Sequence, residues 1–121
     1  MLKDEELTYK IRGCVYEVYR HLGSGFLESV YQRALVSELQ SAGLKVECEV
    51  PVVVRYKGEP VAEQRLDLLV EDSVIIELKA QKQMPISAEP QLINYLKATG
   101  KELGLLVNFS FPKAVVKRVV F

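Results

Sequence analysis

The chain has 121 residues, of which 49% are hydrophobic and 26% are charged. These values are typical of a soluble globular protein, and the length suits a single domain over residues 1–121. The 16 basic and 16 acidic residues give no net charge, which argues against a strongly basic protein that holds nucleic acid mainly by charge. No apolar run approaches the roughly 18 residues of a membrane span, and the polar N-terminus differs from a signal peptide. We therefore expect a cytoplasmic protein without membrane contact.

Cysteine and histidine are too few for the common zinc sites. Cys14 and Cys48 stand 34 positions apart without a second pair, and His21 is the only histidine. A structural zinc site needs four such ligands, so this class is excluded. We predict that both cysteines are buried thiols.

Two amphipathic helices are predicted at the start of the chain. Apolar residues recur at three- and four-residue steps from Leu7 to Leu22, and Gly23 is expected to end this first helix. A second helix is expected to start at Ser24-Gly25 and to end near Gly43.

The hydrophobic period changes from 3.6 to 2 at Val46, which indicates strands. We predict strands over 46–56, 61–70 and 74–80, joined by turns at 57–60 and 71–73 into an antiparallel meander. Pro51 indicates that the first strand lies at an edge or contains a bulge.

One more helix and two closing strands complete the predicted order. The helix runs from Ser87 to Thr99 and tolerates Pro90 in its first turn, and the strands cover 103–109 and 114–121. The order ααβββαββ predicts an α/β (α+β) domain with helices packed on a mixed central sheet.

Three charged residues stand in strongly apolar strands. Glu77 and Lys79 are two positions apart, so the strand period places them on one face, and Asp67 stands alone one strand earlier. Two carboxylates on adjacent strands can bind a hard cation such as Mg²⁺. Lys79 could then hold a water molecule or stabilise charge on phosphorus. A surface ion pair is the alternative interpretation.

These residues resemble the PD-(D/E)xK nuclease superfamily, with Asp67 as the first acid and Glu77-Leu78-Lys79 as the ExK element. Leu66 stands where the superfamily pattern has proline. The segment from Gly25 to Tyr31 is similar to the signature of the GxxExxY family within that superfamily. The remaining similar segments follow in the family's order: 56–58, 67–70, 77–79, 91–96 and 104–109.

The resemblance implies a restriction-endonuclease-like core and a nuclease that cleaves DNA with Mg²⁺ or Mn²⁺. It implies that five residues surround one site, with the first three as metal ligands: Asp67, Glu77, Glu28, Lys79 and Gln91.

Several alternatives stay open at this point. Glu28 falls in the first turn of a helix, where a carboxylate is favoured without any catalytic role. Gln91 follows Pro90, which could move it away from the site, and Tyr95 one turn later could be a packed aromatic residue. The chain could also be a catalytically silent nucleic-acid-binding module, or a protein-interaction module that forms a homodimer or binds another protein.

The site hypothesis constrains the turn between the second and third strands. Opposing residues in an antiparallel pair share a face, so Asp67 must lie opposite Glu77. This register pairs Val70 with Val74 and leaves 71–73 as a three-residue loop. We also predict that Lys79 is partly buried beside the carboxylates.

Overall fold

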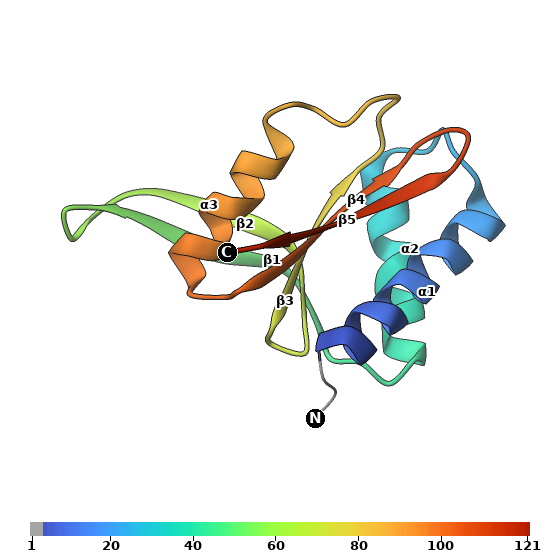
Figure 1. Cartoon of the computed structure of the whole chain (residues 1–121), viewed down its shortest axis with the longest axis horizontal. Coiled ribbons are helices and arrows are strands. Elements are labelled where there is room, and N and C mark those ends of the chain that lie inside the picture. Colours follow the sequence, from blue (N-terminus) through green and yellow to red (C-terminus); the bar gives the residue numbers. More distant parts are fainter. Residues whose placement is uncertain (1–3) are drawn as a thin grey trace.

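The structure is a computed structural model that describes residues 4–121, in which three helices and five strands follow the predicted order (Figure 1). The elements are α1 (Asp4–Leu22), α2 (Glu28–Ser41), β1 (Val46–Tyr56), β2 (Glu59–Val70), β3 (Val74–Lys79), α3 (Ala88–Thr99), β4 (Leu103–Phe109) and β5 (Ala114–Val120). The predicted α+β class and restriction-endonuclease-like arrangement are confirmed. Among these helices, none is both long and apolar enough to span a membrane.

The five strands form one mixed sheet in the order β1-β2-β3-β4-β5. Neighbouring strands are antiparallel except for β3 and β4, which are parallel because α3 carries the chain back between them. Val70 pairs with Val74, so the predicted loop over 71–73 is confirmed. β1 lies at one edge of the sheet, where Pro51 needs no ladder partner on its free side.

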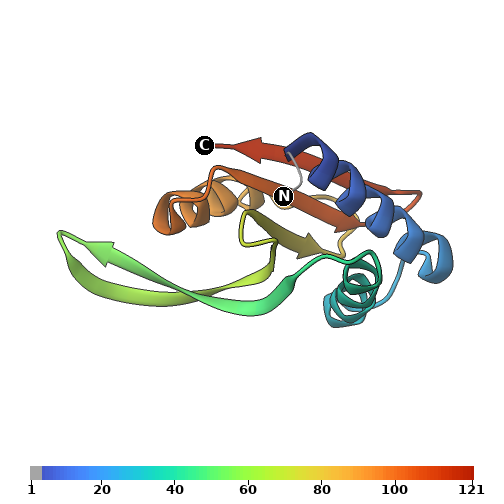
Figure 2. The ribbon, with the colours of Figure 1, turned by 90° about the horizontal axis from the view of Figure 1, so that it is seen from below.

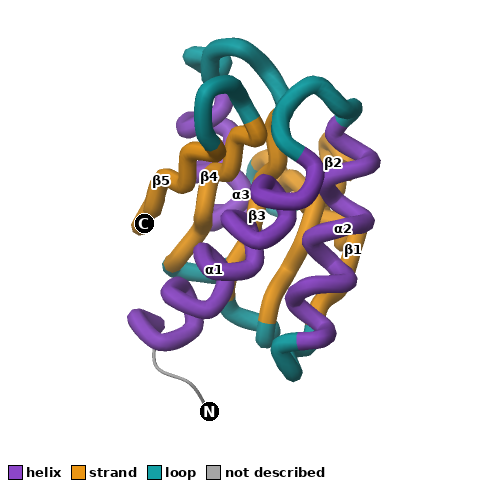
Figure 3. The backbone as a smooth tube through the Cα atoms, turned by 90° about the vertical axis from the view of Figure 1, so that its right-hand side faces the viewer, coloured by secondary structure: helices purple, strands orange, loops and turns teal. Residues whose placement is uncertain are grey.

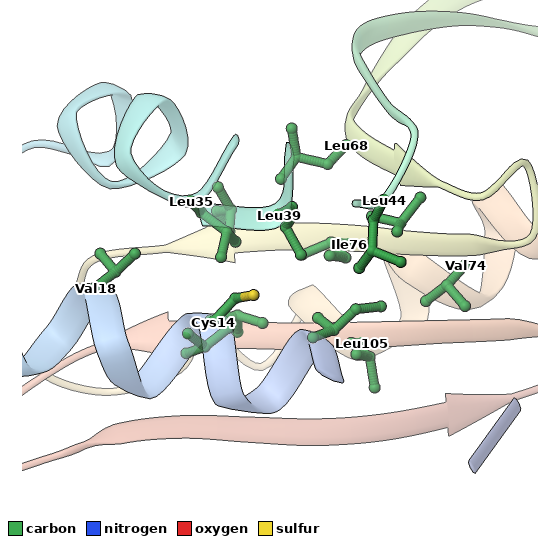
Figure 4. Close-up of a cluster of buried hydrophobic side chains, with 14 of the residues drawn as sticks. Cys14, Val18, Leu35, Leu39, Leu44, Leu68, Val74, Ile76 and Leu105 are labelled. Atoms are coloured by element: carbon green, nitrogen blue, oxygen red, sulfur yellow. The ribbon is translucent and has the colours of Figure 1, made fainter. Parts of the chain in front are cut away.

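Helices cover both faces of the sheet. Figure 3 shows α1 and α2 on one face and α3 on the other. The first face packs Leu35, Leu39 and Ile76 into a cluster that Figure 4 shows in detail, and the second face packs Ile75 against Leu92 of α3. As a result β3 and β4 are buried on both faces, so charged residues of β3 stand in apolar surroundings.

The second helix begins later than predicted, at Glu28. The buried hydroxyl of Tyr31 donates to the carbonyl of Gly23 at 2.6 Å and accepts the N–H of Phe26 at 3.2 Å. Gly25 has a φ of 107°, which only glycine adopts readily. These contacts hold residues 23–27 as a loop, so a tertiary contact decides where the helix begins.

The prediction of two buried thiols is half wrong, since Cys14 is buried but Cys48 is exposed. Cys48 lies on the edge strand β1, most of which is not covered by a helix. An alternating pattern therefore does not guarantee burial on an edge strand.

The β1–β2 hairpin extends well beyond β3, as Figures 1 and 2 show in green and yellow-green. Its turn is the two residues Lys57-Gly58, both with positive φ, rather than the four residues 57–60. The register shifts between Val54 and Arg55. Only residues 68–70 of β2 pair with β3, so the outer part of the hairpin is largely exposed.

Candidate active site

Asp67 and Glu77 meet where β2 separates from β3. Their strands pair up to Leu68 and Ile76, and the same register places the two acids opposite each other. The N–H of Asp67 donates to Oε1 of Glu77 at 3.3 Å, and the N–H of Leu78 donates to Oδ2 of Asp67 at 2.7 Å. Each carboxylate thus binds the backbone of the other strand.

Both carboxyl groups are partly or fully removed from water. Glu77 is only 5% exposed, and Asp67 is half-buried. Burial, followed by the negative charge of Asp67, raises the pKa of Glu77 from 4.5 to about 8. Burial also raises the pKa of Asp67, while the Leu78 N–H opposes this shift. The pair therefore holds one proton near neutral pH.

Lys79 is half-buried, two residues after Glu77 on the same strand. Its positive charge opposes the burial that raises the pKa of both Asp67 and Glu77. Within residues 4–121, no ion pair of 4.0 Å or less joins its ammonium to a carboxylate. Lys79 is thus near enough to act on the pair electrostatically without being bound to it.

Gln91 and Tyr95 lie one turn apart on α3, and Tyr95 is near enough to the carboxylate pair to respond to its charge. Nε2 of Gln91 donates to Oη of Tyr95 at 3.2 Å. Burial raises the pKa of the Tyr95 hydroxyl, and the charges of Glu77 and Asp67 add to this shift. Pro90 does not displace Gln91, because the helix has already begun at Ala88 and Gln91 donates its N–H to Ser87.

Glu28 is not grouped with Asp67 and Glu77. It is exposed at the first residue of α2, which has Leu27 as its N-cap. No group of three or more His, Cys, Asp or Glu side chains over residues 4–121 is spaced to hold one metal ion. The structure therefore brings Asp67 and Glu77 together but does not gather Glu28 with them as a third ligand.

Two residues near Asp67 and Lys79 were not predicted from the sequence. Glu49 has a φ of 51° and interrupts the β1–β2 ladder beside Asp67. Burial is the largest cause of the raised pKa of Asp67, and the negative charge of Glu49 adds to it. Asn108 is buried on β4, and its side chain exchanges two hydrogen bonds with the backbone of Gln81, just after Lys79. Asn108 could have been identified from the sequence, because it is a polar residue inside the apolar run 103–109. Nothing in the sequence indicates the backbone conformation of Glu49.

Comparisons with known proteins identify the superfamily of the chain and a solved structure with a similar fold. The sequence model of the PD-(D/E)XK nuclease superfamily matches residues 5–119. The solved crystal structure of SSO0001 has a similar fold, with a TM-score of 0.64 over 76% of this chain and 22% sequence identity, and the match covers 48% of that longer chain. The search of curated proteins gave no match. Because the superfamily match spans nearly all residues, the chain belongs to the PD-(D/E)XK nuclease superfamily.

Proposed function

We propose that this protein is a metal-dependent nuclease that hydrolyses phosphodiester bonds in DNA, acting as one domain. The observation that carries the proposal is the Asp67–Glu77 pair, two carboxyl groups held together in apolar surroundings with Lys79 on the same strand. The segment from Gly25 to Tyr31 supports assignment to the GxxExxY family within the superfamily.

The pair fits a hard divalent cation, Mg²⁺ or Mn²⁺, by its chemistry. Both groups offer oxygen atoms, and they repel each other when both are ionised, a repulsion that a cation relieves. Members of the superfamily generally use divalent metals. When bound, such an ion supplies an activated water and neutralises charge on the phosphate.

The remaining residues position water and phosphate around the pair. Lys79 stabilises negative charge that develops on the phosphorus oxygens, because its ammonium lies in partly dehydrated surroundings. Tyr95 and Gln91 close the α3 side of the site through their mutual hydrogen bond. Glu28, at the N-terminus of α2, reaches the site only if substrate or metal draws it in, and we assign it an accessory role.

Cleavage of labelled DNA tests the proposal directly. Purified protein is incubated with duplex, single-stranded and branched DNA in Mg²⁺, Mn²⁺ or chelator. We expect cleavage with a divalent cation only, and its loss in Asp67→Asn and Glu77→Gln. Glu102→Gln is the matched control, because this carboxylate is exposed and precedes Leu103, which pairs with Val74 at the start of β3 and not with Glu77. Wild-type protein that binds a cation and DNA but cuts none of these substrates would instead identify a catalytically silent module.

A further inference from the structure

A groove of about 680 Å³ lies between the β1–β2 hairpin and α3. The polar side chains that line it come from both walls: Arg55 and Gln64 from the hairpin, and Asn94, Tyr95 and Lys97 from the helix. Apolar positions on the hairpin complete the wall. Figure 1 shows α3 alongside the projecting hairpin, and α3 also contacts β1.

The charge of the lining residues favours an anionic ligand in this groove. Two cations, two amides and a phenol face it, and none of its lining residues is acidic. The chain as a whole has as many acidic as basic residues, so an acid-free lining differs from the average surface. Arg55 also donates to the carbonyl of Gly58 at 3.3 Å, which anchors its side chain near the tip of the hairpin.

Tyr95 connects the groove with the carboxylate pair. Tyr95 lines the groove and also lies close enough to Glu77 and Asp67 to respond to their charge. Arg55 pairs with Pro60, which precedes Asp67 by seven residues on β2. At about 3.3 Å per residue this separation is at most about 23 Å. One strand of a duplex carries about seven phosphates over this length, at 3.4 Å each.

We infer that this groove binds the phosphodiester backbone of one nucleic-acid strand beside the scissile bond, with Arg55 and Lys97 contacting phosphates. The inference rests on the proposed nuclease function and adds the site that holds the substrate. Guanidinium and ammonium groups are the usual phosphate contacts, and the amides of Gln64 and Asn94 can donate to sugar or phosphate oxygens.

Fluorescence anisotropy in chelator measures DNA binding without cleavage. The probes are one labelled oligonucleotide as a single strand and as a duplex, titrated at several salt concentrations. Loss of two phosphate contacts lowers the slope of log affinity against log salt by about 1.4 for a single strand and about 1.8 for a duplex. We expect this change in Arg55→Gln/Lys97→Gln, and about half of it in each single variant.

A matched control removes two cations elsewhere. Arg20→Gln/Lys113→Gln alters a hollow on the α1–β5 side of the molecule and should leave affinity and salt slope unchanged. Because Lys97 also lies 5.6 Å above the Phe121 ring, melting temperatures are measured for every variant. Arg55→Gln leaves the contact between Lys97 and Phe121 intact.

The groove and the nuclease can fail separately. If wild-type protein cleaves DNA while Arg55→Gln/Lys97→Gln binds with an unchanged salt slope, the groove inference is overturned and the nuclease stands. If wild-type protein cuts no DNA but Arg55→Gln/Lys97→Gln shows the expected decrease in DNA affinity and in salt slope, the groove inference is supported and the proposed nuclease activity is overturned. A wild-type protein that binds neither form of DNA overturns the groove.

Discussion

Cation binding at the Asp67–Glu77 pair should release a proton near neutral pH. The buried Glu77 keeps its proton because ionisation would place a second negative charge beside Asp67 in apolar surroundings. A divalent cation needs both groups as carboxylates, so binding must expel this proton. Proton release therefore reports whether the cation occupies this pair or another place on the protein.

The raised pKa sets the size of this effect. With a pKa of about 8, Glu77 is about 0.9 protonated at pH 7 and about 0.1 protonated at pH 9. Cation binding should thus release about 0.9 proton at pH 7 and about 0.1 at pH 9. The apparent affinity should rise by up to about tenfold per pH unit below pH 8 and level off above it.

The same shift makes the metal-free protein less stable as pH rises. Between pH 4.5 and about 8 the folded state holds a proton on Glu77 that the unfolded state has lost. Within this window the free energy of unfolding should fall by at most about 1.4 kcal/mol per pH unit. Glu77→Gln removes the titration, so its stability relative to wild type should improve steadily from pH 6 to pH 8.

Calorimetry with MnCl₂ in two buffers of different ionisation enthalpy gives the proton count at each pH. Denaturant unfolding at pH 6, 7 and 8 gives the stability of wild type, Glu77→Gln and the control Glu102→Gln. Equal proton release at pH 7 and pH 9 would refute the reasoning. So would a Glu77→Gln variant whose stability follows that of wild type across the whole pH range.

Three further substitutions test separate parts of the arrangement. Lys79→Met should keep cation affinity within a few-fold of wild type by calorimetry but lower kcat by about 10²–10³; a loss of cation affinity equal to the loss of kcat would contradict this role. Gly104→Ala places a Cβ 2.8 Å from the buried Leu92 of α3, so it should destabilise the fold by about 1–3 kcal/mol in urea unfolding. Tyr31→Phe leaves two backbone groups of the preceding loop without their partner, which should cost about 1–3 kcal/mol, whereas the exposed Tyr16→Phe should leave stability unchanged.

The relation between the two acids could be predicted because it depends on local rules. Alternation fixed the face of Glu77 and Lys79, and the three-residue turn fixed the register that brings Asp67 opposite Glu77. Both rules act within about ten residues of chain, where the strand period and the turn length leave few choices.

The surroundings of the pair could not be predicted in the same way. Burial of Glu77 depends on α3, which packs on the second face of the sheet after a crossover from β3 to β4. The start of α2 depends on the Tyr31 hydroxyl, and the exposure of Cys48 depends on which strand lies at the sheet edge. Each of these features depends on contacts between segments that are far apart in the sequence, so the local hydrophobic pattern does not predict it.

One feature of the sheet explains why the carboxylate pair and the groove occur together. β2 follows β3 for only three residue pairs and then separates from it, while the hairpin continues outward. At the point of separation the N–H groups of Asp67 and Leu78 are free to bind carboxylate oxygens instead of ladder carbonyls. Beyond it, the space between hairpin and α3 becomes the groove.

This geometry predicts that the two features can be separated by shortening the hairpin. Val52 and Gln64 lie opposite each other, so replacing residues 53–63 with Asn-Gly closes the hairpin with a two-residue turn. The removed residues are mostly exposed, and the core contacts of Val52 remain, so the variant should fold. Mn²⁺ binding with release of about 0.9 proton at pH 7 should persist. DNA affinity and its salt slope should fall at least as far as in Arg55→Gln, because Arg55 is removed with the hairpin whereas Lys97 remains on α3. If the shortened protein folds but no longer binds the cation, the outer hairpin is needed to hold the carboxylates in place. This result would contradict the prediction that the carboxylate pair forms independently of the groove.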